Sequence, residues 1–110
     1  MQVTQQELDR LVNTIVESSD PERIYLFGSM SRGETHRDSD LDLLIVEKKP
    51  FNAHRSRHQE ISRIRRVLTN FRFPKDIVVY SSNEVEEWQS SQNHLIGRCM
   101  KEGKLLYERR

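Results

Sequence analysis

Two aspartates at the start of a long apolar run constrain this chain more than any other feature of its sequence. Asp40 and Asp42 flank a leucine and lead directly into an uninterrupted apolar run over residues 43–46. Such a run predicts a β-strand that is buried on both faces, as in a sheet covered by helices on either side. Because side chains alternate along a strand, we expect Asp40 and Asp42 to point to the same face.

Helical and strand patterns alternate along the rest of the chain. Strands are predicted at residues 24–27, 41–46, 77–80 and 105–107; helices are predicted after the capping-box spacings Thr4–Glu7 and Ser81–Glu84, over residues 53–71 and over residues 95–100. The last helix is expected to end at Gly103. This alternation predicts an α/β fold in which helices cover a small sheet.

Length and composition restrict the class of protein. The chain of 110 residues suffices for one compact domain, so we expect residues 1–110 to form a single unit. Its only cysteine, Cys99, excludes an internal disulfide and a cysteine-based zinc site, and we expect it to be a buried, inert thiol. A formal net charge of +1 gives no basis for direct nucleic-acid binding. Without a signal pattern or an apolar run near the roughly 18 residues of a membrane span, we expect a cytoplasmic protein that does not bind membranes.

The acidic residues form a candidate metal site. Two neighbouring carboxylates repel each other unless a divalent cation lies between them, and their hard oxygens suit Mg²⁺ or Mn²⁺. Asp76 heads the strand predicted at residues 77–80, much as Asp40 heads the strand before it. We expect Asp40, Asp42 and Asp76 to be metal-binding and catalytic, and to hold two ions about 3.5–4 Å apart for displacement at phosphorus.

A glycine-serine turn forms a candidate phosphate site. Gly28-Ser29 follows the strand predicted at residues 24–27, and a short helical turn that ends at Gly33 is expected after it. Backbone amides at such a turn bind anions, and glycine permits the chain to approach a ligand closely. We therefore assign Gly28, Ser29 and Arg32 to nucleotide binding.

These residues carry a resemblance to a known family. Gly28-Ser29, ten intervening residues and then Asp40-x-Asp42 resemble the signature of the DNA polymerase β-like nucleotidyltransferases. Within that superfamily the closing residues 102–107 resemble those of the minimal nucleotidyltransferases. The resemblance implies an α/β (α+β) fold with helices packed on a small mixed β-sheet. It also implies that Gly28 and Ser29 hold nucleotide phosphates and that Asp76 matches the third carboxylate, although Met30 stands where many relatives have arginine.

The resemblance implies a partner as well as an activity. Minimal nucleotidyltransferases commonly pair with a HEPN protein encoded nearby, as antitoxin to an RNA-cleaving toxin, and transfer AMP from ATP to a tyrosine of that toxin. We therefore expect a magnesium-dependent nucleotidyltransferase that releases pyrophosphate. Two alternatives stay open at this point: an antitoxin that neutralises its partner by contact alone, and a transferase for small molecules such as aminoglycosides.

The segment predicted as a helix over residues 53–71 is basic. His54 and His58 lie one helical turn apart, but without a third zinc-type ligand nearby we expect them to be exposed or to face substrate. The arginines of this segment form either a solvated face or a docking surface for the partner. In the second interpretation, His54, Arg57 and His58 would lie nearest the metal site.

Overall fold

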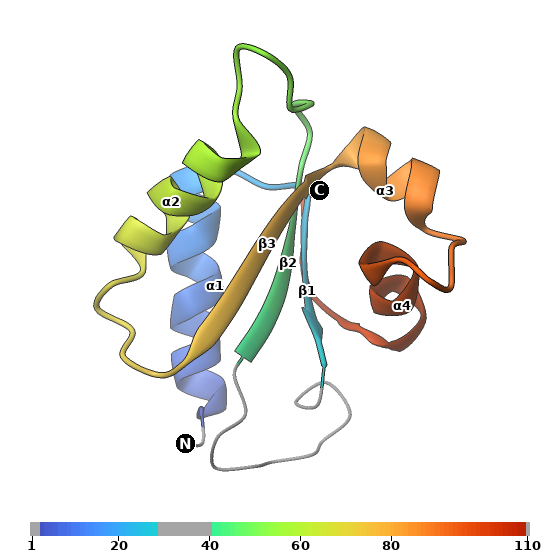
Figure 1. Cartoon of the computed structure of the whole chain (residues 1–110). Helices are drawn as coiled ribbons and strands as arrows, with labels where there is room; N and C mark the ends of the chain where they lie inside the picture. The colour runs from blue at the N-terminus through green and yellow to red at the C-terminus, as the bar shows by residue number, and fades with distance from the viewer. Residues whose placement is uncertain (1–2, 29–40, 110) are drawn as a thin grey trace.

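The computed structural model of the chain describes residues 3–28 and 41–109, within which helices and strands follow one another as the sequence predicts. In chain order the elements are α1 (Gln5–Ser19), β1 (Arg23–Phe27), β2 (Leu41–Glu47), α2 (Arg57–Val67), β3 (Lys75–Ser81), α3 (Ser82–Trp88), α4 (Leu95–Glu102) and β4 (Lys104–Glu108). Figure 1 shows the helices packed around a central sheet.

The strands form a mixed sheet in the order β3-β2-β1-β4. β2 and β3 are parallel, whereas β1 is antiparallel to both of its neighbours, β2 and β4. The end of β1 and the beginnings of β2 and β3 therefore lie at one end of the sheet, the lower end in Figure 1. This arrangement confirms the predicted fold class.

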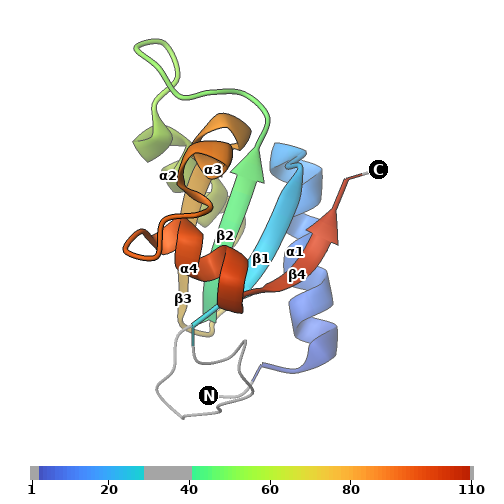
Figure 2. The ribbon, with the colours of Figure 1, turned by 90° about the vertical axis from the view of Figure 1, so that its right-hand side faces the viewer.

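Helices cover both faces of the sheet (Figures 1 and 2), with α1 and α2 on one face and α3 and α4 on the other. Apolar side chains of β2 point alternately to the two faces of the sheet, which explains why helices pack on both. Leu43 and Ile45 belong to the core cluster under α1 and α2, whereas Leu44 and Val46 belong to the cluster with Val85 of α3 and further residues of α4. The prediction that this strand is buried on both faces is confirmed.

Both predicted capping boxes form. The backbone N–H of Glu7 donates to Thr4 Oγ1 at 3.0 Å, and the backbone N–H of Thr4 donates to the Glu7 carboxylate at 3.2 Å. Ser81 and Glu84 make the same reciprocal pair at the start of α3, with distances of 2.9 and 3.3 Å. These local bonds satisfy amides that a helix start leaves without partners.

The helix predicted over residues 53–71 is shorter than expected. α2 begins after Ser56, whose hydroxyl accepts from the backbone N–H of Gln59, and it ends at Val67. Upstream, Asn52 forms a tight backbone bridge with Arg55 and accepts from the N–H of His54. Asparagine and serine offer the backbone local hydrogen bonds that compete with a helix, and here they exclude residues 53–55 from α2.

The direction of α2 corrects the predicted position of its basic residues. The helix connects two parallel strands, so it must run back antiparallel to them. Arg57, at its start, therefore reaches the far end of β3, where it donates to the carbonyl of Val79 at 2.9 Å. Arg65 lies near the end of α2, and its guanidinium is 3.7 Å from the carboxylate of Asp76 at the beginning of β3. The residues predicted to be nearest the acidic site, His54, Arg57 and His58, are thus at the wrong end.

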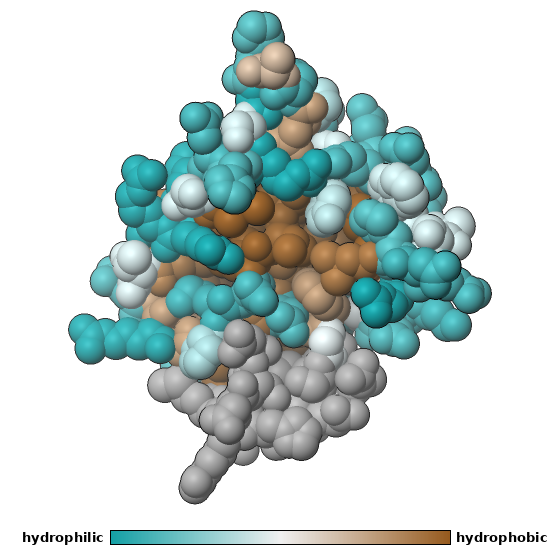
Figure 3. Space-filling view, in the orientation of Figure 1, coloured by the Kyte–Doolittle hydropathy of each residue, from teal (hydrophilic) through white to brown (hydrophobic). Residues whose placement is uncertain are grey.

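Arg57 also stabilises the sheet edge that β3 forms. Its guanidinium pairs with Glu84 and lies 4.6 Å from the ring centroid of Tyr80 and 4.9 Å from that of Phe51. On the side of the molecule that Figures 1 and 3 show, apolar surface lies in the middle and hydrophilic surface surrounds it. The bond from Arg57 to Val79 occupies one of the backbone groups that an edge strand leaves unpaired.

The lengths of the helices also bear on whether a helix of this chain could cross a membrane. Within residues 3–28 and 41–109, none of the helices combines the length and the hydropathy that crossing a bilayer requires.

Candidate functional site

Asp42 and Asp76 are direct neighbours on the parallel strands β2 and β3. The strand register pairs them residue for residue, and adjacent strands are separated by about 4.8 Å. Their side chains lie on the same face as Leu44 and Val78, two positions further along, which pack in the cluster on the α3 and α4 side. The sequence pattern likens Asp76 to Asp40, since both stand at a strand start, but the register pairs Asp76 with Asp42 instead.

Gly28 lies against the carboxylate of Asp42. It follows β1 directly, and Phe27 of that strand is paired with Asp42. The glycine has a φ of +79°, and a Cβ atom built on it would lie 2.4 Å from Oδ2 of Asp42. Both the backbone conformation and the close approach therefore require glycine here. The predicted phosphate turn and one of the predicted metal ligands are thus in contact.

Arg65 is the cation that faces Asp76. The two groups are 3.7 Å apart, and their side chains are 58% and 64% exposed. An ion pair this exposed contributes about 0–1 kcal/mol, so it is easily exchanged for another partner of the carboxylate. The sequence places Arg65 among the arginines of the basic segment but not beside Asp76, because only the direction of α2 decides that contact.

Three of the predicted site residues, Ser29, Arg32 and Asp40, lie outside the described residues. Among residues that the structure does describe, histidine, cysteine and acidic side chains form no group of three that could hold a metal ion. Asp42 and Asp76 offer the carboxylate oxygens that Mg²⁺ prefers, from adjacent strands and on one face. They therefore fit as part of a magnesium site, and the predicted three-carboxylate set stays a prediction.

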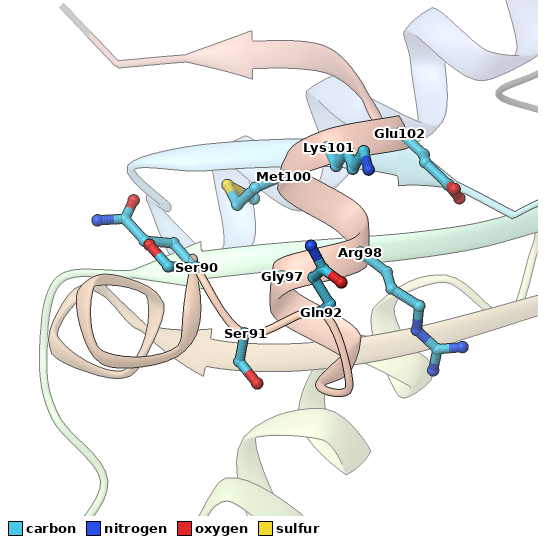
Figure 4. Close-up of a pocket in the computed structure, with 9 residues that line it drawn as sticks. Ser90, Ser91, Gln92, Gly97, Arg98, Met100, Lys101 and Glu102 are labelled. Carbon is cyan, nitrogen blue, oxygen red and sulfur yellow. The ribbon is translucent and has the colours of Figure 1, made fainter.

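A cavity of about 220 Å³ adjoins Gly28 on the α4 side of the sheet. Its described lining consists of Phe27, Gly28, Leu95, Arg98, Cys99 and Glu102. Arg98 and Glu102 also line a larger groove of about 600 Å³ along α4 (Figure 4). This cavity is not predictable from the sequence, because no local pattern indicates that α4 packs beside the end of β1.

The other candidate residues do not join the site. Cys99 is buried, and burial raises the pKa of its thiol to about 11, so it stays protonated and unreactive at neutral pH, as predicted. His54 and His58 are both exposed, as predicted.

Comparison with known proteins decides the family. The sequence profile described as "Polymerase beta, Nucleotidyltransferase" matches residues 9–110. The chain belongs to this family. It is a nucleotidyltransferase by family, which confirms the resemblance seen in the glycine-serine turn and the aspartate pair. None of the curated protein sequences matches the chain.

Solved structures confirm the nucleotidyltransferase fold. A protein from Sulfolobus solfataricus assigned to the nucleotidyltransferases has a TM-score of 0.64 at 22% identity, over 93% of this chain and 78% of that one. A toxin–antitoxin structure with AMP-PNP has a TM-score of 0.60 at 21% identity, over 93% and 74%. A second toxin–antitoxin structure, of a mutant MntA-HpeT, has a TM-score of 0.59 at 19% identity, over 99% and 76%.

Proposed function

We propose that this nucleotidyltransferase transfers AMP from ATP to a tyrosine hydroxyl of a HEPN-type toxin and thereby acts as its antitoxin. The observation that carries the proposal is the juxtaposition of Asp42, Asp76 and Gly28 at one end of the sheet. Carboxylates for a cation and a glycine turn for phosphates are the two components that transfer of a nucleotide requires.

Magnesium fits the acidic component of the site. Asp42 and Asp76, together with Asp40, would hold the ion or ions. Bound Mg²⁺ supplies charge neutralisation on the phosphates and raises the acidity of an attacking hydroxyl. In this proposal Gly28, Ser29 and Arg32 orient the triphosphate so that its α-phosphorus lies beside the carboxylates.

The proposed step is an in-line displacement at the α-phosphorus. The acceptor oxygen forms a bond to that phosphorus, and the bond to the oxygen shared with the β-phosphate breaks, so pyrophosphate leaves. The hydroxyl proton passes to a nearby base, for which the carboxylate of Asp76 is our candidate. Its side chain is 64% exposed, which permits an acceptor on another protein to approach from solvent.

The proposal of a toxin partner is based on similarity to solved structures. Two of the similar structures are described as toxin–antitoxin assemblies, and one of them contains AMP-PNP, an ATP analogue. Both structures support a partner toxin for this chain, and the one with AMP-PNP also supports an adenine nucleotide. The exposed C-terminal half of α2, with Arg65 and Arg66, lies closer to Asp76 than the N-terminal half and is our candidate docking surface.

The decisive experiment measures pyrophosphate release from each of the four nucleoside triphosphates. It is performed with Mg²⁺, with and without the product of the neighbouring gene, and the acceptor is identified by mass spectrometry. We expect release from ATP only when the partner is present, with one or more AMP groups on a partner tyrosine. Partner binding without pyrophosphate release from any nucleotide would instead favour an antitoxin that acts by contact alone.

A further inference from the structure

Arg98 projects from α4 at the rim of the cavity beside Gly28. The apolar side chains in the described lining of this cavity are Phe27, Leu95 and Cys99. Arg98 is itself exposed, and Figure 4 shows it extending from the same side of α4 as Glu102, one helical turn away. A guanidinium on an apolar wall next to a glycine turn is suited to bind a phosphate group.

The order of the strands and the cavity shared with Gly28 place Arg98 beyond Gly28 as seen from the carboxylates. Asp76, Asp42 and Gly28 lie on or directly after β3, β2 and β1, which are consecutive strands. α4 packs on the face to which both aspartates point, because its Cys99 belongs to the same core cluster as Leu44 and Val78. A ligand that extends from the aspartates past Gly28 therefore reaches α4 next.

We propose that Arg98 binds the β- and γ-phosphates of the nucleoside triphosphate and so holds the pyrophosphate that leaves. This inference rests on the proposed function, in which the α-phosphorus lies beside Asp42 and Asp76. The phosphates beyond it then pass Gly28 and arrive at the cavity of Arg98.

The backbone that carries Arg98 is anchored for such a role. A Cβ atom on the preceding residue, Gly97, would lie 1.7 Å from the carbonyl oxygen of Ser91, so α4 packs directly against the loop before it. His94 caps the same helix, since its Nδ1 accepts from the backbone N–H of Ile96 at 3.1 Å. A binding side chain on a fixed helix loses less freedom when it engages a ligand.

The test compares Arg98→Gln with Lys101→Gln. Lys101 is a matched control, because it is a cation on the same helix that lines the larger groove but is absent from the lining of the cavity beside Gly28. Dissociation constants for ATP, pyrophosphate and AMP are measured with Mg²⁺ by displacement of a fluorescent ATP analogue. For Arg98→Gln we expect binding of ATP and of pyrophosphate to weaken about tenfold, with AMP binding and the melting temperature unchanged. For Lys101→Gln we expect all three constants to stay as in the unchanged protein.

Two outcomes would overturn the assignment. If Arg98→Gln weakens AMP as much as ATP, the residue contacts the nucleoside half of the ligand rather than the leaving phosphates. If it binds all three ligands like the unchanged protein, Arg98 does not contact the nucleotide. Failure of the unchanged protein to bind ATP would instead count against the proposed function itself, so the two failures are distinguishable.

Discussion

The carboxylate of Asp42 occupies the space into which any side chain on Gly28 would project. A Cβ at position 28 would lie 2.4 Å from Oδ2 of Asp42, on a backbone whose φ of +79° already disfavours every residue except glycine. The end of β1 and the beginning of β2 are thus fitted to each other at the candidate site. A change at either residue is therefore expected to affect the other.

Gly28→Ala should lower both stability and nucleotide binding. We expect a loss of about 1–2 kcal/mol in the free energy of unfolding from the left-handed backbone, and a further loss from displacement of Asp42. Denaturant unfolding separates the backbone loss from the loss caused by Asp42 if Gly28→Ala is also made in an Asp42→Ala background, where the clashing carboxylate is absent. If Gly28→Ala costs as much with Asp42→Ala as without it, the two residues are not coupled and this interpretation is wrong.

Asp42→Asn and Asp76→Asn should each reduce AMP transfer about 100-fold or more, because each removes a proposed ligand of the metal. The melting temperature should stay the same or rise slightly, since each substitution relieves repulsion between neighbouring carboxylates. Asp9→Asn, on the exposed surface of α1, is the control and should change neither quantity. Full transfer activity of either site variant under Mg²⁺ would contradict the proposed roles.

Nucleotide and metal should stabilise the protein together. A ligand that binds only the folded state raises the melting temperature, and Mg²⁺ held by Asp42 and Asp76 would strengthen nucleotide binding by offsetting negative charge. We expect ATP with Mg²⁺ to raise the melting temperature more than ATP and Mg²⁺ do separately, and Asp42→Asn to abolish the difference. Equal stabilisation by ATP in excess chelator would mean that the carboxylates do not bind a metal.

Arg57→Ala should destabilise the fold rather than the site. The side chain pairs with Glu84, donates to the carbonyl of Val79 and lies over the ring of Tyr80, so we expect a loss of about 1–3 kcal/mol. Arg66→Ala, on the exposed surface of the same helix, should stay within about 0.5 kcal/mol of the unchanged protein. Denaturant unfolding compares the two; similar values for both variants would show that the contacts of Arg57 contribute little.

The buried Glu47 should make stability fall as the pH rises. Burial raises the pKa of Glu47 from 4.5 to about 7, and it outweighs Arg55, which donates to this carboxylate and lowers its pKa. The folded chain therefore holds a proton that the unfolded chain releases, and the free energy of unfolding decreases between about pH 4.5 and about pH 7. Arg63 lowers the pKa of Glu60 to about 2, so that residue has the opposite effect, and its stabilisation is lost as the pH falls from 4.5 toward 2.

The variant Glu47→Gln separates the pH effect of Glu47 from that of Glu60, because glutamine imitates the protonated carboxyl of Glu47 at every pH. We expect it to be more stable relative to the unchanged protein at pH 8 than at pH 5, by about 2–3 kcal/mol. Urea unfolding across this range measures the difference. A constant difference between the two proteins at all pH values would exclude titration of Glu47 in the folded state.

Local patterns in the sequence predicted most elements of the fold and part of the site. Thr4 and Ser81 begin their helices as their capping boxes indicate, and the apolar run after Asp42 forms a strand that is buried on both faces. These features depend on neighbours within a few residues or on side-chain alternation along one strand, both of which are visible in the chain itself. The error at the start of α2 arose because Asn52 accepts from the backbone N–H of His54 and Ser56 accepts from that of Gln59, so the helix begins only after Ser56.

Only the tertiary structure decided which distant residues meet. The parallel register of β2 and β3 pairs Asp76 with Asp42, the direction of α2 brings Arg65 to Asp76 and takes Arg57 to Glu84, and the packing of α4 places Arg98 beside Gly28. Strand register and helix direction follow from burying both faces of the sheet at once, which is a property of the whole chain. The sequence by itself therefore determined the chemical groups and the strands that carry them, whereas the packing of the core determined how those groups are arranged.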